Sequence, residues 1–226
     1  MTFTIKYYMN GKRIKYSSYE EIRKLPDFNN IIFINFSRNN LKELPDKLPQ
    51  SLQKLNCCFN NLTKIPDNLP KSLQQLVCNY NSLTELPNNL PQSLKILICR
   101  NNKLTYLPEK LPETLQELDC NHNKLIYLPL KLPETLVELD CSHNNLNYLP
   151  HKLPETLQEL DCSKNNLREL PAILPQSLKE LDCYGNNLTS LPSNLHEYKS
   201  LTYIDYRENE INYISEDNNV FLNKCK

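Results

Sequence analysis

A strict repeat of 21 residues runs through most of this chain and leaves few folds open to it. In the 226-residue sequence, cysteine recurs at that interval from Cys57 to Cys183, and an asparagine follows each cysteine three residues later. The asparagine column extends towards the N-terminus to Asn39 and, after one unit of 23 residues, towards the C-terminus to Asn209, which gives nine units. A fixed period of this size predicts a solenoid, in which each unit packs only against its neighbours.

Each central unit combines a short strand, a turn and a proline-containing return segment. The unit "LQELDCSKNNLRELPAILPQS" has Leu, Leu and Cys at its first, fourth and sixth positions, which suits a strand that buries one side. Prolines four residues apart, such as Pro108 and Pro112, argue against a helix in the rest of the unit, because proline inside a helix costs about 3 kcal/mol. We therefore expect extended, polyproline-like return segments.

The pattern resembles the leucine-rich repeats of the short class found in bacterial effectors, "LPxxL...LxxLxxxxNxLxxLP", and is similar to repeat proteins of giant DNA viruses of amoebae. The resemblance covers roughly residues 31 to 215. It implies a leucine-rich repeat solenoid, a β-rich horseshoe with a parallel concave β-sheet and extended, polyproline-like convex segments.

Three regions are predicted along the chain. Residues 1–30 should form an N-terminal cap, a hairpin around Asn10-Gly11 followed by a short helix with a capping box at Ser18 and Glu21. Residues 31–215 should hold the nine repeats, and residues 216–226 should form a C-terminal tail that departs from the repeat. Solenoids need such caps because a terminal repeat otherwise exposes its apolar face.

The repeated cysteines and asparagines are predicted to be structural. Free cysteine packs as a small hydrophobe, and a single-file column offers neither good disulfide geometry nor converging metal ligands, so we expect no metal. Each asparagine should find partners in the turn of the next repeat, since a buried amide needs them. Cys58, exposed on the concave face, and Cys225, near a frayed terminus, should be the reactive thiols.

The concave face should carry positions three, five, seven and eight of each unit, and these divide it. Positions three and five form two acidic columns over the C-terminal half: Glu117, Asp119, Glu138, Asp140, Glu159, Asp161, Glu180, Asp182 and Asp205. The N-terminal half offers an apolar group, Phe59, Tyr80, Val77, Ile96 and Ile98, flanked by Arg38 and Arg100. Stacked carboxylates repel by about 0.8 kcal/mol per neighbour at 5 Å in water, so the columns either serve binding or were inherited by repeat duplication.

These features favour a non-catalytic protein–protein interaction module that binds a partly basic, partly apolar protein on its concave face. Two alternatives stay open. The acidic columns could bind a cation, with His122 and His143 taking part, or the chain could recognise substrates for a ubiquitin ligase that acts in trans. Effectors with these repeats can carry a ligase domain with a catalytic cysteine, but only about 15 residues follow the last repeat here.

The composition argues against several other classes of protein. The only glycines are Gly11 and Gly185, so a glycine-rich nucleotide loop cannot be built, and we expect no cofactor. The formal net charge is zero and the acidic columns would repel phosphate, which argues against nucleic acid. No signal peptide or apolar run of about 18 residues is present, so we expect a protein of the cytoplasm, that of a host cell if the protein is viral or an effector, without membrane contact. We also expect a monomer.

Overall fold

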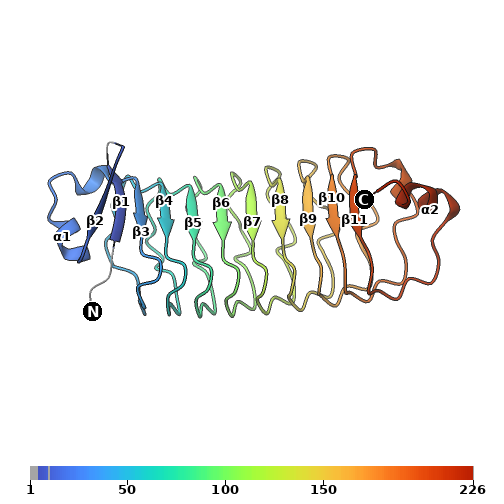
Figure 1. Ribbon diagram of the computed structural model, residues 1–226, viewed down its shortest axis with the longest axis horizontal. Coiled ribbons are helices and arrows are strands. Elements are labelled where there is room, and N and C mark those ends of the chain that lie inside the picture. Colours follow the sequence, from blue (N-terminus) through green and yellow to red (C-terminus); the bar gives the residue numbers. More distant parts are fainter. Residues whose placement is uncertain (1–4, 10, 226) are drawn as a thin grey trace.

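The computed structural model describes residues 5–9 and 11–225, which form an elongated stack of parallel strands (Figure 1). Nine three-residue strands lie in chain order: β3 (Phe33–Asn35), β4 (Lys54–Asn56), β5 (Gln75–Val77), β6 (Ile96–Ile98), β7 (Glu117–Asp119), β8 (Glu138–Asp140), β9 (Glu159–Asp161), β10 (Glu180–Asp182) and β11 (Tyr203–Asp205). Each pairs with the equivalent positions of its neighbours. The predicted leucine-rich repeat solenoid with a parallel sheet is confirmed.

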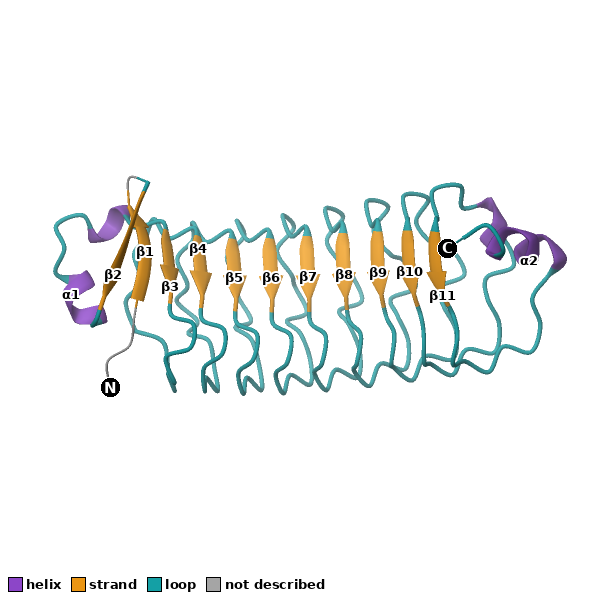
Figure 2. Ribbon diagram, viewed as in Figure 1, coloured by secondary structure: helices purple, strands orange, loops and turns teal. Residues whose placement is uncertain are grey.

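An antiparallel hairpin extends the sheet at its N-terminal end. Strand β1 (Ile5–Met9) pairs with β2 (Lys12–Tyr16) on one side and with β3 on the other (Figure 2). Gly11, in the turn, has a φ of +77°, a conformation that glycine adopts without strain; Asn10 of the predicted turn lies outside the described residues. Helix α1 (Tyr19–Arg23) follows, and the Ser18 hydroxyl caps it by accepting the Glu20 N–H.

The C-terminal end is closed by a helix that the repeat pattern does not predict. Residues 216–226 were expected as a tail, yet α2 (Glu216–Leu222) forms there, with the Ser215 hydroxyl accepting the Asn218 N–H at its start. Asn218 is 2% exposed, and its side chain contacts the short 3-10 helix η2 (Leu195–Glu197), whose N-terminal counterpart is η1 (Phe28–Asn30). Within residues 5–9 and 11–225, no helix is long and apolar enough to cross a membrane.

The return segments contain turns instead of helices, as the prolines predict. Every residue between β3 and β10 is described, and none of them is helical. A tight turn follows the second proline of each unit, as where the Leu115 N–H donates to the Pro112 carbonyl at 3.0 Å. A hydroxyl column then joins neighbouring units: Thr135 Oγ1 lies 2.8 and 2.7 Å from the carbonyls of Glu113 and Leu115.

The core is a set of leucine columns with the cysteine column among them. The seven repeated cysteines, from Cys57 to Cys183, are all free and have 0% exposure. Burial raises their pKa values well above the ordinary range of a thiol, as at Cys120 and Cys141, because a thiolate would lose its hydration there. Their predicted role as core residues is confirmed.

The asparagine column ties each unit to the one before it. The Asn144 Nδ2 lies within hydrogen-bond distance of the carbonyls of Cys120, Cys141 and Ser142, at 3.1, 3.1 and 3.0 Å. Its Oδ1 accepts the Leu125 N–H at 2.9 Å. The prediction that the next repeat supplies these partners was wrong: they come from the same unit and the preceding one. The amide thereby satisfies backbone groups of two units at once.

Candidate functional site

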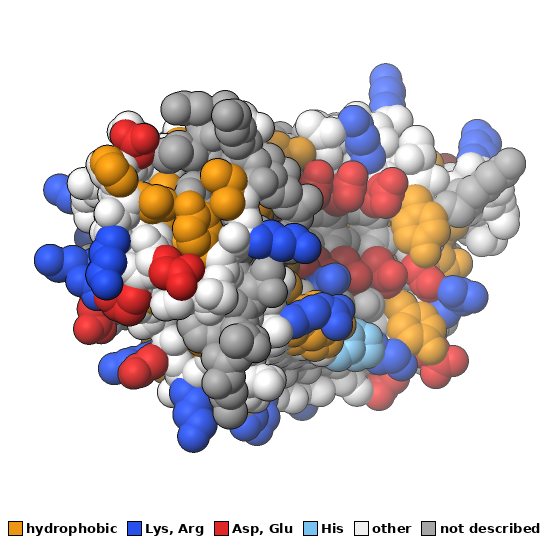
Figure 3. Space-filling view, turned by 60° about the vertical axis from the view of Figure 1, so that its left-hand side comes forward, with side chains coloured by type: hydrophobic (Ala, Val, Ile, Leu, Met, Phe, Trp, Pro, Cys, Tyr) orange, Lys and Arg blue, Asp and Glu red, His pale blue; other side chains and the backbone are white. Residues whose placement is uncertain are grey.

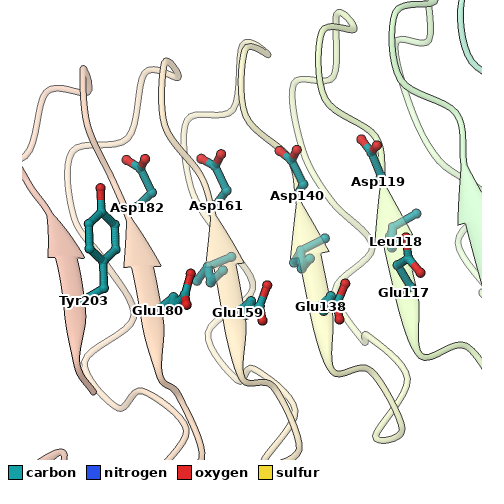
Figure 4. Close-up of a pocket in the computed structure, with 12 residues that line it drawn as sticks. Glu117, Leu118, Asp119, Glu138, Asp140, Glu159, Asp161, Glu180, Asp182 and Tyr203 are labelled. Carbon is teal, nitrogen blue, oxygen red and sulfur yellow. The ribbon is translucent and has the colours of Figure 1, made fainter. Parts of the chain in front are cut away.

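The acidic residues predicted for the concave face form two continuous columns. Glu117 faces Glu138, and the same pairing continues through Glu159 to Glu180, while the aspartates of position five pair from Asp119 through Asp182. Figure 4 shows the four aspartates side by side with a parallel row of glutamates, and Tyr203 takes the place of a glutamate on β11. A shallow groove lies between the columns, lined by Leu118, Leu139 and Leu160.

Turn chemistry explains why an aspartate stands at the end of each acidic strand. The Asp161 Oδ1 accepts the N–H of Ser163 at 2.9 Å, and Asp182 accepts that of Tyr184 at the same distance. Asn35 and Asn56 make the equivalent contact at 2.8 and 3.1 Å. An uncharged amide therefore supports the turn as well as a carboxylate does, so the turn does not require the charge.

Burial and mutual repulsion disfavour the charged form of several of these carboxyls. The pKa of Asp119 is raised from 3.8 to about 6, first by burial and then by the neighbouring charge of Asp140. Burial also raises the pKa of Asp161 and, together with the Glu138 charge, that of Glu117. The columns thus hold negative charge at a cost to folding, and a cationic partner would relieve that cost.

Asp205, at the C-terminal end of the aspartate column, is neutralised within the chain. It is 8% exposed, and its carboxylate accepts hydrogen bonds from both the Nε and the Nη2 of Arg207. These contacts lower its pKa, the opposite of the shift at Asp119. Asp205 was predicted to contact a partner with the others, but its carboxylate is already paired.

Position eight forms a column of stacked side chains along the edge of the sheet. Its members all have φ between 50° and 63°, the left-handed region: Arg38, Phe59, Tyr80, Asn101, His122, His143, Lys164, Gly185 and Glu208. The Phe59 and Tyr80 rings are stacked at 4.4 Å, with the Arg38 guanidinium 4.5 Å from the Phe59 centroid. Figure 3 shows this row of basic, aromatic and histidine side chains beside the acidic rows. We call it the stacking column.

The predicted apolar group is divided between the strands and the stacking column. Val77 and Ile98 pair in the position-five column, and Ile96 lies in the position-three column; all three are half-buried. Phe59 and Tyr80 are 39% and 40% exposed. Because the latter two follow the strands and turn away through their left-handed backbone, the five residues form two neighbouring patches instead of one.

Position seven was predicted to point onto the concave face, and this was wrong for its small side chains, although the Arg100 side chain at the same position is 43% exposed. Cys58 is 9% exposed, and Asn79 and Asn121 are 5% and 8% exposed, because these side chains are packed in the turn between position five and the stacking column. Burial also raises the pKa of Cys58, so it is not the reactive thiol that the sequence suggested. Cys225 is half-buried, with its Sγ 3.7 Å from the Leu201 carbonyl.

Arg100 connects the acidic columns to the stacking column, in which two histidines are stacked. The Arg100 Nε lies 3.7 Å from Asp119, and its guanidinium carbon lies 5.9 Å from the Tyr80 centroid. The rings of His122 and His143 are stacked at 4.0 Å. Burial and then the positive form of His122 lower the pKa of His143. Among the residues that the structure describes, no group of three or more His, Cys, Asp or Glu could hold a metal ion.

A further apolar patch lies outside the sheet face and was not predicted. Tyr106, Tyr127 and Tyr148 occupy the same position in three successive units and are 37%, 40% and 45% exposed. Leu130, beside them, is 78% exposed, and Tyr127, Tyr148 and Leu130 border one groove. The signal was present in the sequence, since tyrosine recurs there at the repeat interval.

Comparison with known proteins agrees with this architecture. A parallel sheet with one three-residue strand per unit, joined by an asparagine column, defines the class of leucine-rich repeat solenoids. The family described as Leucine Rich Repeat matches residues 51–71 and 177–197. No curated protein sequence matches the chain.

Three solved structures give the extent of the likeness. YopM from Yersinia enterocolitica is 33% identical and superposes with a TM-score of 0.70 over 81% of this chain and 44% of its own. A leucine-rich repeat protein from Leptospira interrogans is 30% identical, with a TM-score of 0.74, 92% of this chain and 62% of its own.

The third is a Shigella effector leucine-rich repeat domain, 30% identical, with a TM-score of 0.53, 84% of this chain and 73% of its own. The chain belongs to the leucine-rich repeat family. It spans about half of the YopM chain and somewhat more of the Leptospira chain. Solenoids of this kind generally use their extended surface to bind other proteins.

Proposed function

We propose that this chain is a non-catalytic protein-interaction module that binds a partner across its sheet face. The observation that carries the proposal is the pair of in-register acidic columns from Glu117 to Asp182. Their charges repel one another, and the turn at position five would be equally well supported by asparagine. A feature that costs stability and that the fold does not need is best explained by a use outside the fold.

The partner is a protein with a basic surface beside an apolar one. Residues 1–113 contain 16 Lys and Arg against 9 Asp and Glu, whereas residues 114–226 contain 10 against 17. The acidic half would attract a basic surface and speed its encounter, and the effect would weaken above an ionic strength of about 0.1 M. Phe59 and Tyr80 in the other half would contribute exposed aromatic area, the usual source of binding energy at interfaces.

The proposed setting is the cytoplasm of a host cell. Two of the similar structures are of effectors, the leucine-rich effector YopM of Yersinia pestis and the Shigella effector domain. A viral protein that acts inside an infected cell would work in the same compartment. The thiol chemistry supports a reducing compartment, because nine free cysteines occur and none is paired.

The test is capture of partners from an extract of the source host cell by three forms of the protein. The first is the wild type, and the second has Asp119, Asp140, Asp161 and Asp182 replaced by Asn. The third is a matched control that loses four exposed charges away from the sheet face, through replacement of Glu109, Glu155, Glu169 and Glu197 by Gln.

We expect a captured protein to bind the control as it binds the wild type, and to bind the Asp-column variant at least tenfold more slowly at low salt. The variant should remain folded by circular dichroism, because asparagine supports the same turn. If every captured protein binds all three forms at the same rate, the acidic columns are a surface inherited by repeat duplication and the proposal is wrong.

A further inference from the structure

The stacking column is interrupted at one unit. The rings of Phe59 and Tyr80 are stacked at 4.4 Å with an interplanar angle of 7°, and those of His122 and His143 at 4.0 Å and 22°. Asn101 lies between the two pairs. It has no ring, and its side chain makes no hydrogen bond with the described residues.

The interruption is the size of one ring. Adjacent strands lie about 4.8 Å apart, so Tyr80 and His122, two units apart, are separated by about 9.6 Å along the column. A ring placed midway would lie about 4.8 Å from each neighbour, within the range of about 4.5–7 Å at which aromatic rings interact. The rings already in the column show that this spacing supports stacking.

The backbone through the gap is continuous with the rest of the column. Asn101 has a φ of 52°, its N–H donates to the Asn121 carbonyl at 3.0 Å, and its carbonyl accepts the Asn81 N–H at 3.3 Å. A shallow surface groove runs past Tyr80, Asn101 and His122. Only an aromatic ring is missing from the column at this unit.

The stacking column also has no ring at Gly185, but that unit differs from the one at Asn101, because a side chain of this protein occupies the space. Gly185 has a φ of +63°, and a Cβ added there would lie 2.9 Å from Lys164 Cδ. The Lys164 Nζ sits 4.3 Å from the centroid of the Tyr184 ring, so the ammonium covers an aromatic face of the same chain. At Asn101 the corresponding contact is looser, because the Arg100 guanidinium carbon lies 5.9 Å from the Tyr80 centroid and its Nε lies 3.7 Å from Asp119.

The surroundings of the gap favour a neutral aromatic ring. Such a ring would contact the exposed faces of Tyr80 and His122 and would lie close to the Arg100 guanidinium, which is 5.9 Å from the Tyr80 centroid. Stacking and cation–π attraction would then act together. A second guanidinium would meet the like charge of Arg100, and an aliphatic side chain would gain neither contribution.

We infer that the gap at Asn101 is a slot for one aromatic side chain of the protein partner, held between Tyr80 and His122. This rests on the proposed function only in assigning the ring to a protein; the slot itself belongs to this chain. Aromatic side chains buried in small pockets are the commonest anchors of protein interfaces.

The test titrates the intact protein with N-acetyl-tryptophanamide, N-acetyl-leucinamide and N-acetyl-argininamide at one ionic strength, followed by NMR. We expect the tryptophan probe to shift the Asn101 amide and the His122 ring signals in a saturable way, and the other two to bind at least fivefold more weakly. Tighter binding of the arginine probe, or equal binding of the leucine probe, would overturn the inference.

Two variants test whether the probe binds in the slot: one fills the slot and the other leaves it open. Asn101→Phe should abolish binding of the tryptophan probe by completing the stack, and it should fold because Phe59 has the same backbone conformation in the same column. Asn101→Gly leaves the slot open without backbone strain and should retain the affinity within twofold. Unchanged binding in a folded Asn101→Phe protein would show that the probe sits elsewhere.

The outcome is separable from that of the proposed function. The tryptophan probe is neutral, so replacing Asp140, Asp161 and Asp182 by Asn should change its affinity by less than twofold, although the same replacements slow a basic partner. Failure of the probe alone removes the slot and leaves the acidic columns as the binding surface. Failure of the Asp-column variant alone does the reverse.

Discussion

Replacing Asp119 by Asn should make the protein more stable at neutral pH. The Asp119 side chain is 16% exposed, and its pKa is raised from 3.8 to about 6 by burial and by the Asp140 charge. Each pKa unit corresponds to about 1.4 kcal/mol, so ionising this carboxyl in the folded chain costs at most about 3 kcal/mol. Asparagine avoids that cost, keeps the hydrogen bond from the Asn121 N–H, and gives up only a 3.7 Å contact with Arg100. We expect a net gain of about 1–3 kcal/mol.

The gain should depend on pH in a defined direction. Below pH 3.8 the carboxyl is protonated in both the folded and the unfolded chain, so it contributes nothing to the difference. Between pH 3.8 and about 6 the unfolded chain ionises first, and the penalty on folding grows. Above that window the penalty is constant. The advantage of Asp119→Asn should therefore be full at pH 7.5, about half as large near pH 5, and absent near pH 3.5.

Urea unfolding between pH 3.5 and pH 8, followed by circular dichroism, measures this directly. Asp205→Asn is the matched control, because Arg207 lowers the pKa of Asp205; that substitution should destabilise the protein at pH 7.5. The reasoning fails if Asp119→Asn leaves the free energy of unfolding unchanged at pH 7.5, or if its advantage grows as the pH falls.

Three further experiments test the packing of the repeats. In thiol labelling without denaturant, Cys225 should react first, while Cys58 and the seven cysteines of the cysteine column stay unlabelled on the same timescale. Fast labelling of Cys120 would contradict the burial of that column. Cys141→Leu should cost no more than the about 1–3 kcal/mol of overpacking, whereas Cys141→Asp should cost clearly more by burying an unpaired carboxyl, and equal losses in urea unfolding would mean that the position is not enclosed. Asn144→Ala should lower the free energy of unfolding by about 3 kcal/mol, because its amide serves backbone groups of two units; a loss below about 1 kcal/mol would indicate that water replaces it.

The repeat interval was enough to predict the architecture and the acidic columns. A fixed period forces equivalent positions into register, so the alignment of Glu117 with Glu138, or of Asp140 with Asp161, follows from the sequence once strands are assumed. The buried cysteine column followed in the same way. These features depend only on which positions face inward and which face outward.

The turn after each strand could not be predicted in this way. Phe59, Tyr80 and His122 adopt the left-handed conformation, which single-residue preferences disfavour for large side chains. Hydrogen bonds between neighbouring units impose this conformation. The Phe59 N–H donates to the Asn79 carbonyl of the next unit at 3.0 Å, and the equivalent bond recurs at His122. This rotation buries the small side chains of position seven and stacks those of position eight, which is why Cys58 was misplaced and the stacking column was not predicted. Alternation along an extended strand was the wrong guide beyond position six.

Because the register of the strands is constant, the distance between two features on this surface is set by the number of units between them. Inserting or deleting one whole 21-residue unit would leave the hydrophobic columns, the asparagine bonds and both caps joined as before. It would move the features on one side of the change by about 4.8 Å relative to those on the other. Unequal recombination between similar units such as those of β7 and β8 could therefore lengthen or shorten the charged tract by one unit at a time. A lineage could adjust the distance between its aromatic and acidic contacts to a changing target without having to evolve a new fold.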